Sequence, residues 1–215
     1  MSRSFRFLGF LLVLAGFLYA GAVSSKLPDR VPSHWDAAGR VNGTMPKPWG
    51  VFIVPLVMAL LWLLFMALPR LSPRGFEMES FSRSWGILTA AVLAFMLYIE
   101  ILTLNAAVSG GRLSPRPIFG GIGVLFMVIG SVLKNVKRNF FAGIRTPWTL
   151  ASEEVWDQTH KMAAGLFLAA GLFARALPAL RAQVRPIYVR LGIIPEEVAT
   201  GLRAGEEPGS AVAHD

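Results

Sequence analysis

The stretch WGILTAAVLAFMLYIEILTLNAAV, residues 85–108, decides the fold class. It is apolar almost throughout, and as a helix rising about 1.5 Å per residue it is long enough to cross the roughly 30 Å hydrocarbon layer of a bilayer. Apolar and polar residues do not alternate along it, as they would in a barrel strand. A helix satisfies every backbone hydrogen bond of such a segment within lipid. The stretch therefore predicts a transmembrane helix.

Further apolar blocks of the same kind lie at residues 5–23, 50–68, 118–133 and 162–180. Hydrophobic residues make up 54% of the 215-residue chain and charged residues 16%, which is too little polar surface for a soluble fold. We therefore expect an all-α, polytopic helical membrane protein with about five transmembrane helices. This composition excludes a soluble enzyme and a disordered protein.

The first block and the loop charges predict the orientation. Arg3 and Arg6 precede the block, and Ala20-Gly21-Ala22 is similar to a signal-peptide cleavage site. The apolar run exceeds the roughly 7–15 residues of a signal core, so we interpret it as a retained helix, with cleavage as the alternative. Lys and Arg number ten in the segments on the N-terminal side and six in the opposite loops. The four arginines of the tail would level the count, but short loops near the first helices weigh more. This predicts a cytoplasmic N-terminus and a C-terminal tail outside.

The loop at residues 24–49 is a candidate binding surface outside the cell. Its prolines and glycines, among them Gly39, stiffen the chain and allow tight turns. Between them lie His34, Trp35 and Asp36, which bring together an imidazole, an aromatic ring and a carboxylate. The alternative is structural, since Trp35 would be a usual interfacial aromatic and Asp36 could cap a turn at residues 37–38.

The loop at residues 134–161 is a candidate site on the cytoplasmic side. Thr146-Pro147 predicts a turn, and Ser152 predicts the N-cap of a helix that continues into the last apolar block. Trp156 and His160 are four residues apart and share a face of that helix. Interfacial anchoring would explain each of these side chains singly. It explains less well the set of polar and turn-forming residues that precede the helix, namely Asn139, Gly143, Arg145, Thr146 and Pro147.

Glu100 is the one acidic residue well inside an expected transmembrane helix. A charge at membrane depth is costly, and such residues usually face a partner or a water path. The alternative is that Glu100 is tolerated near the outer interface. No catalytic residues, cofactor or nucleic-acid partner are predicted. The chain has no cysteine, and its histidines lie on different elements, so no metal site is expected either.

Two groups of residues resemble a known family. GIRTPWTL at residues 143–150, within the stretch 139–161, resembles the motif of SdpI-type integral membrane immunity proteins, as do Trp156 and Thr159-His160. Leu27-Pro28, His34-Trp35-Asp36 and Gly39 are similar to an uncharacterised two-span domain that often precedes that motif. Asp36 stands where this domain usually has asparagine.

This resemblance implies a division of the chain and a function. Residues 1–70 would form a two-span module, residues 84–182 an SdpI-like three-span module, and residues 183–215 a polar tail in place of the family's sixth helix. The implied function is non-enzymatic immunity to a membrane-active toxin peptide or bacteriocin in a bacterial inner membrane. Membrane lipids, a toxin outside and a protein partner inside would be the binding partners. The alternatives are a signalling module that docks a cytoplasmic partner, and a small transporter that uses Glu100.

Overall fold

The computed structural model describes residues 1–36, 39–76 and 78–191, and for residues 177–182, 184, 185 and 188 it describes the backbone only. Within this part, four helices are long and apolar enough to cross a membrane. They contain α1 (Arg3–Ser24), α2 (Lys47–Ala67), α3 (Ser82–Val108) and α4 (Pro115–Leu133). The first four expected blocks are thereby confirmed as helices of a polytopic membrane protein.

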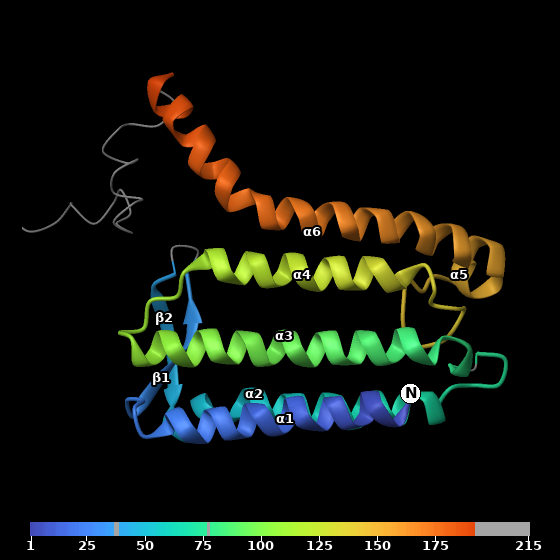
Figure 1. The fold of residues 1–215 in the computed structure, drawn as a ribbon, viewed down its shortest axis with the longest axis horizontal. Coiled ribbons are helices and arrows are strands. Elements are labelled where there is room, and N and C mark those ends of the chain that lie inside the picture. Colours follow the sequence, from blue (N-terminus) through green and yellow to red (C-terminus); the bar gives the residue numbers. More distant parts are fainter. Residues whose placement is uncertain (37–38, 77, 192–215) are drawn as a thin grey trace, which may run out of the picture.

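The long helices lie side by side, with different structures at the two ends of the bundle (Figure 1). The α1–α2 connection lies at one end, whereas α5 (Pro147–Ala151) and the start of α6 (Glu153–Arg190) lie at the other. Two short 3-10 helices, η1 (Leu68–Arg70) and η2 (Glu79–Phe81), flank the α2–α3 connection. The two loops singled out in the sequence are therefore at opposite ends of the molecule.

A β-hairpin is the feature that the all-α expectation missed. Strands β1 (Arg30–Trp35) and β2 (Val41–Pro46) pair antiparallel within the loop at residues 24–49. Val31 is buried on its helix-facing side, packed with Ala20 and Val51. Each strand has a free edge in this two-stranded sheet, so Pro32 in β1 and Pro46 in β2 are tolerated.

The interior of the α1–α2–α3 bundle is held by large apolar side chains. Val13, Met58 and Leu93 form its buried centre, with one residue from each helix. Since α3 packs against both α1 and α4, it connects the two modules expected from the sequence. The proposed domain boundaries remain a prediction.

Helix α6 packs along α4 through small residues. A Cβ atom added to Gly123 would lie 2.7 Å from the carbonyl oxygen of Gly171, and one added to Gly130 would lie 2.8 Å from that of Ala164. Such close backbone approach is typical of membrane helix pairs. The expected fifth block, residues 162–180, lies within α6, but part of it is outside the described side chains, so a fifth crossing remains a prediction.

The end of α6 differs from the expected tail. The helix continues to Arg190, so the first residues of the segment 183–215 are helical. In Figure 1 this last part of α6 turns away from α4. The rest of the expected tail, residues 192–215, lies outside the described part of the chain.

Candidate functional site

At the tip of the hairpin, Trp35 and Gly39 join the hairpin to the α3–α4 connection. The indole Nε1 of Trp35 donates a 2.6 Å hydrogen bond to the carbonyl oxygen of Gly111. Gly39 has a φ of +78°, and its carbonyl oxygen accepts a 2.9 Å hydrogen bond from the Leu113 amide. A Cβ atom at Gly39 would collide with the Leu113 carbonyl oxygen. Trp35 and Gly39 therefore fix the position of the hairpin.

Asp36 closes the hairpin turn. Its Oδ1 accepts a 2.9 Å hydrogen bond from the Arg40 amide, and its Oδ2 lies 2.7 Å from Arg40 Nε. The expected cap of the turn at residues 37–38 lies outside the described residues. His34, by contrast, is exposed on β1 opposite Gly43. Of the hairpin residues singled out in the sequence, His34 has the exposed side chain, whereas Trp35, Asp36 and Gly39 are partly or fully buried.

Glu100 faces the interior of the helix bundle and is 1% exposed. A Cβ atom added to Gly16 of α1 would lie 2.9 Å from Glu100 Oε2, which places the carboxyl group directly against that helix. Within the described residues, neither carboxyl oxygen has a hydrogen-bond partner. Glu100 therefore faces the neighbouring helices rather than lipid, and whether it lies near the outer interface remains a prediction.

In the loop that follows α4, Asn139 is the organising residue. Its side chain is fully buried and forms four hydrogen bonds with the loop backbone. The amide nitrogen donates to the carbonyl oxygens of Lys137 and Ala142, both at 2.9 Å. The amide oxygen accepts from the backbone N–H groups of Phe141 and Ala142 at 2.8 and 2.7 Å. These bonds replace regular secondary structure in a buried segment.

His160 holds the next turn of the loop. Its Nε2 accepts a 3.0 Å hydrogen bond from the Ile144 amide, and its Nδ1 lies 2.8 Å from the carbonyl oxygen of Trp156. This arrangement requires a neutral ring with the proton on Nδ1. Burial is the largest influence on the pKa of His160 and lowers it, against smaller opposing effects of the Trp156 carbonyl and Asp157. Gly143, with φ of +108°, passes so close to the ring that a Cβ atom would collide with Nε2.

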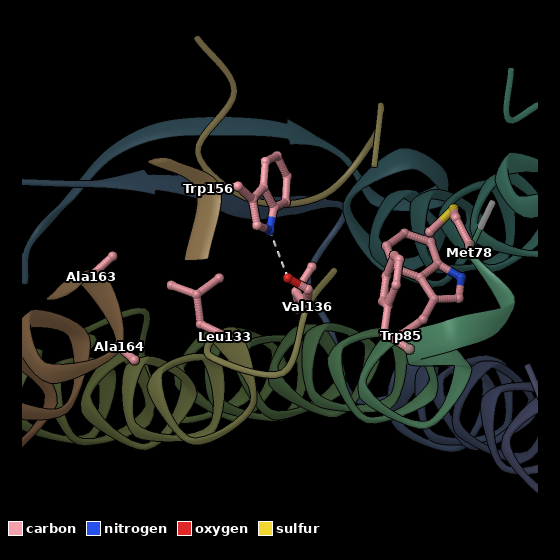
Figure 2. Close-up of a cluster of buried hydrophobic side chains, with 8 residues drawn as sticks. Met78, Trp85, Leu133, Val136, Trp156, Ala163 and Ala164 are labelled. Carbon is pink, nitrogen blue, oxygen red and sulfur yellow. Dashed lines mark hydrogen bonds between the residues drawn. The ribbon is translucent and has the colours of Figure 1, made fainter. Parts of the chain in front are cut away.

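Trp156, near the start of α6, connects that helix to the segment that follows α4. Its indole Nε1 donates a 2.8 Å hydrogen bond to the carbonyl oxygen of Val136, and its ring stacks on His160 with centroids 4.0 Å apart. Figure 2 shows this bond within the buried cluster that also contains Trp85 and Leu133. Trp156 is fully buried, so the expectation of an interfacial anchor does not describe it.

Thr146 and Pro147 begin α5, a short helix that the sequence analysis did not predict. Thr146 Oγ1 accepts from the Thr149 amide, and Thr149 Oγ1 accepts from the Thr146 amide, so the pair forms a capping box. Thr149 Oγ1 also donates to the Ile144 carbonyl oxygen at 2.9 Å. The expected turn at Thr146-Pro147 and the expected N-cap at Ser152 are both confirmed.

Arg138, rather than Arg145, pairs with the start of α6. Arg138 Nη2 lies 3.5 Å from Glu153 Oε1, and its Nη1 donates a 2.8 Å hydrogen bond to the Leu150 carbonyl oxygen. Arg145 instead donates to the Phe140 carbonyl oxygen at 2.6 Å and remains exposed. In the sequence, Arg138 belongs to a run of basic residues with Lys134 and Lys137, and nothing in that run marks it as different.

The structure thus brings most of the candidates expected on the cytoplasmic side into one unit, which we call the motif loop. It consists of residues 134–161 and contains Asn139, Gly143, Thr146, Trp156 and His160 as its buried or turn-forming elements. The hairpin candidates lie at the other end of the bundle (Figure 1). Glu100 lies between the two ends, within α3.

Comparisons with known proteins agree with this arrangement. Residues 11–59 match the family model described as a domain of unknown function (DUF1648), and residues 135–194 match that of the SdpI/YfhL protein family. The immunity protein SdpI of Bacillus subtilis (strain 168) is 26% identical over 168 residues, which are 78% of this chain and 78% of that protein. The resemblance to SdpI-type proteins is confirmed.

The two matches divide the candidate residues. The SdpI/YfhL match contains nearly all of the motif loop and all of α6. The match to the domain of unknown function contains α1 from Leu11 on, the hairpin and the first part of α2. Glu100 lies in neither matched range. No solved structure matches the chain.

Proposed function

We propose that this chain is a non-enzymatic immunity protein that protects a bacterial cell from a membrane-active toxin peptide or bacteriocin. The observation that carries the proposal is the similarity to the immunity protein SdpI, which extends over 78% of both chains. The match to the SdpI/YfhL family model over residues 135–194 supports it. A bundle of long apolar helices is the scaffold that such a role in the membrane needs.

The proposal places the protein in the inner membrane, with the N-terminus and the motif loop in the cytoplasm and the hairpin outside. The loop charges support this orientation. The chain contains no cysteine, so single-cysteine labelling can test it directly. Asn42 and Glu154 are both exposed. In intact cells, a membrane-impermeant maleimide should label Asn42→Cys but not Glu154→Cys; labelling of both, or of Glu154→Cys alone, contradicts this orientation.

Protection itself is tested by expressing the full chain in a sensitive bacterium and exposing the cells to a panel of membrane-active peptides. At least one peptide should kill cells carrying the empty vector and spare cells that express the protein. Equal killing in both strains across the panel, with the protein shown to be in the membrane, would contradict the proposed function.

Within this function, we assign toxin recognition to the hairpin, with His34 as its contacting residue. His34 is exposed, whereas Trp35, Asp36 and Gly39 are engaged in holding the hairpin. His34→Ala should therefore reduce protection without changing membrane abundance. Asn42→Ala, an exposed position on β2, is the matched control. Equal protection by both variants would remove His34 from the site.

A second role, docking of a cytoplasmic protein partner, is favoured by one observation on the motif loop. Trp148 is 72% exposed although it is large and apolar, and Phe140 and Ile144 are also exposed beside Arg145. Large exposed side chains of this kind mark interaction sites. If Trp148 binds a partner rather than lipid headgroups, Trp148→Ala should abolish cross-linking of the motif loop to soluble protein and leave membrane insertion unchanged.

A further inference from the structure

A cavity of about 660 Å³ lies between α3, α4 and α6. Its volume is within the range of roughly 300–1,000 Å³ that small-molecule sites have. The side chains around it are almost all apolar or small, with a single cationic residue, and include Ala94, Tyr98, Gly120, Gly121, Val128 and Arg175. We propose that this cavity holds an acyl chain of one phospholipid, whose phosphate binds to Arg175.

The cavity has the length of one membrane leaflet. Along α4 it extends from Pro117 to Val128, which is about 16 Å at a rise of about 1.5 Å per residue. This is close to half of the roughly 30 Å hydrocarbon layer. Pro117 lies near the start of α4, at the hairpin end of the bundle (Figure 1). The cavity thus corresponds to the leaflet on the hairpin side.

The walls of the cavity present hydrocarbon. Tyr98 is its polar aromatic residue, and the Tyr98 hydroxyl already donates a 2.9 Å hydrogen bond to the Pro117 carbonyl oxygen. The Tyr98 ring packs against Gly121, where an added Cβ atom would lie 2.5 Å from a ring carbon. A Cβ atom added to Gly120 would meet nothing within 4 Å. The space beside Gly120 is therefore unfilled by protein, and an apolar chain fits it.

Arg175 supplies a charge that suits a phosphate. It is exposed and lines the cavity, and its Cβ atom lies 3.5 Å from the position of a Cβ atom added to Gly123, which is level with the middle of the cavity along α4. The long side chain of an arginine at this depth can extend along apolar surface to headgroup level. Its guanidinium then binds a phosphate through two parallel hydrogen bonds. A phospholipid satisfies both the apolar walls and this cation.

The experiment measures retention of dioleoylphosphatidylglycerol by the purified full chain, using native mass spectrometry after extraction from nanodiscs. Wild type should retain one lipid. Gly120→Leu fills the cavity without meeting protein atoms and should lower retention about tenfold, an effect of the size expected for a lost site. Gly165→Leu is the matched control, because a Cβ atom at Gly165 also meets nothing within 4 Å, yet Gly165 does not line the cavity. Equal retention by the two variants would overturn the proposal.

The proposed contact between Arg175 and the lipid phosphate is tested separately. Arg175→Gln should also lower retention about tenfold, whereas Arg116→Gln, an exposed arginine near the start of α4 that does not line the cavity, should not. Normal retention by Arg175→Gln would refute the phosphate contact. If Gly120→Leu instead dissociates a dimer of wild type, a second copy occupies the cavity and the proposal is wrong.

A further measurement uses wild type alone, so its result does not depend on whether the variants fold. After delipidation, phosphatidylglycerol should raise the thermal unfolding midpoint and saturate at one lipid per chain. Dodecyl maltoside, which has an alkyl chain but no phosphate, should not reproduce this shift. An equal shift with both amphiphiles would contradict binding through the phosphate.

Discussion

The hairpin and the motif loop lie at opposite ends of one bundle and use their polar residues differently. In the motif loop, Asn139 and His160 are buried, and the hydrogen-bonding atoms of both side chains are occupied by backbone groups. In the hairpin, His34 is exposed, and Asp36 is only partly buried. The residues that make the motif loop recognisable are therefore those that build it, whereas the contact surface of the hairpin is less constrained by folding.

The largest effect that this comparison predicts is on Trp156. Trp156→Ala should lower the free energy of unfolding by about 3–5 kcal/mol, because it opens a cavity in the buried cluster and leaves the Val136 carbonyl oxygen without its donor. Unfolding in detergent and membrane abundance both report it. Trp148→Ala, at an exposed position of the same loop, is the control and should change stability by less than about 0.5 kcal/mol. Similar losses in the two variants would contradict a structural role specific to Trp156.

The next effect is a pH dependence of stability that comes from His160, a buried residue of the motif loop. Because burial lowers the pKa of His160 in the folded state, the unfolded state binds the proton more readily, and stability should fall as the pH drops below about 6.5. The loss is at most about 1.4 kcal/mol per pH unit and ends once the pH passes the folded-state pKa. Above about 6.5 both states are neutral at this residue, so its contribution no longer changes.

Unfolding of wild type and of His160→Gln between pH 5 and 8 tests this. His160→Gln should be less stable at neutral pH but should lose the pH-dependent part of the stability. A pH profile that is unchanged in His160→Gln would show that another group titrates.

A smaller effect is expected at the hairpin. Trp35→Phe keeps an aromatic ring but removes the hydrogen bond to the Gly111 carbonyl oxygen, and should cost about 1 kcal/mol. Hydrogen exchange should report faster exchange in β1 and β2 with the motif loop unchanged. If exchange accelerates at both ends of the bundle, the hairpin is not the locally held element described here.

Sequence reasoning could predict the transmembrane helices because continuous apolar blocks have one stable conformation in lipid. It also predicted the turn at Thr146 and the N-cap at Ser152, since both depend on local chemistry. The hairpin was missed because the prolines and glycines of residues 24–49 indicated a stiff loop with tight turns. Pro32 and Pro46 are tolerated in its strands because both strands lie at an edge.

Sequence reasoning also could not predict contacts between residues that are far apart in the chain. The bonds from Trp35 to Gly111 and from Trp156 to Val136 join residues far apart in sequence, and no local pattern predicts either partner. Likewise, Arg138 and Arg145 look alike in the sequence. Which of them pairs with Glu153 depends on how the loop folds around Asn139.

The smallest expected change in stability concerns Arg145. It is exposed, and its bond to the Phe140 carbonyl oxygen is one that a lysine amine can replace, so Arg145→Lys should alter the free energy of unfolding by less than about 0.5 kcal/mol. Protection should nevertheless fall, because lysine lacks the planar fork that binds a carboxylate or phosphate through two bonds. Lys137→Arg is the control and should protect like wild type. Full protection by Arg145→Lys at equal abundance would show that the planar fork of Arg145 is not needed for protection. Trp148 and the hairpin would then be the candidates for a functional surface among the described loops.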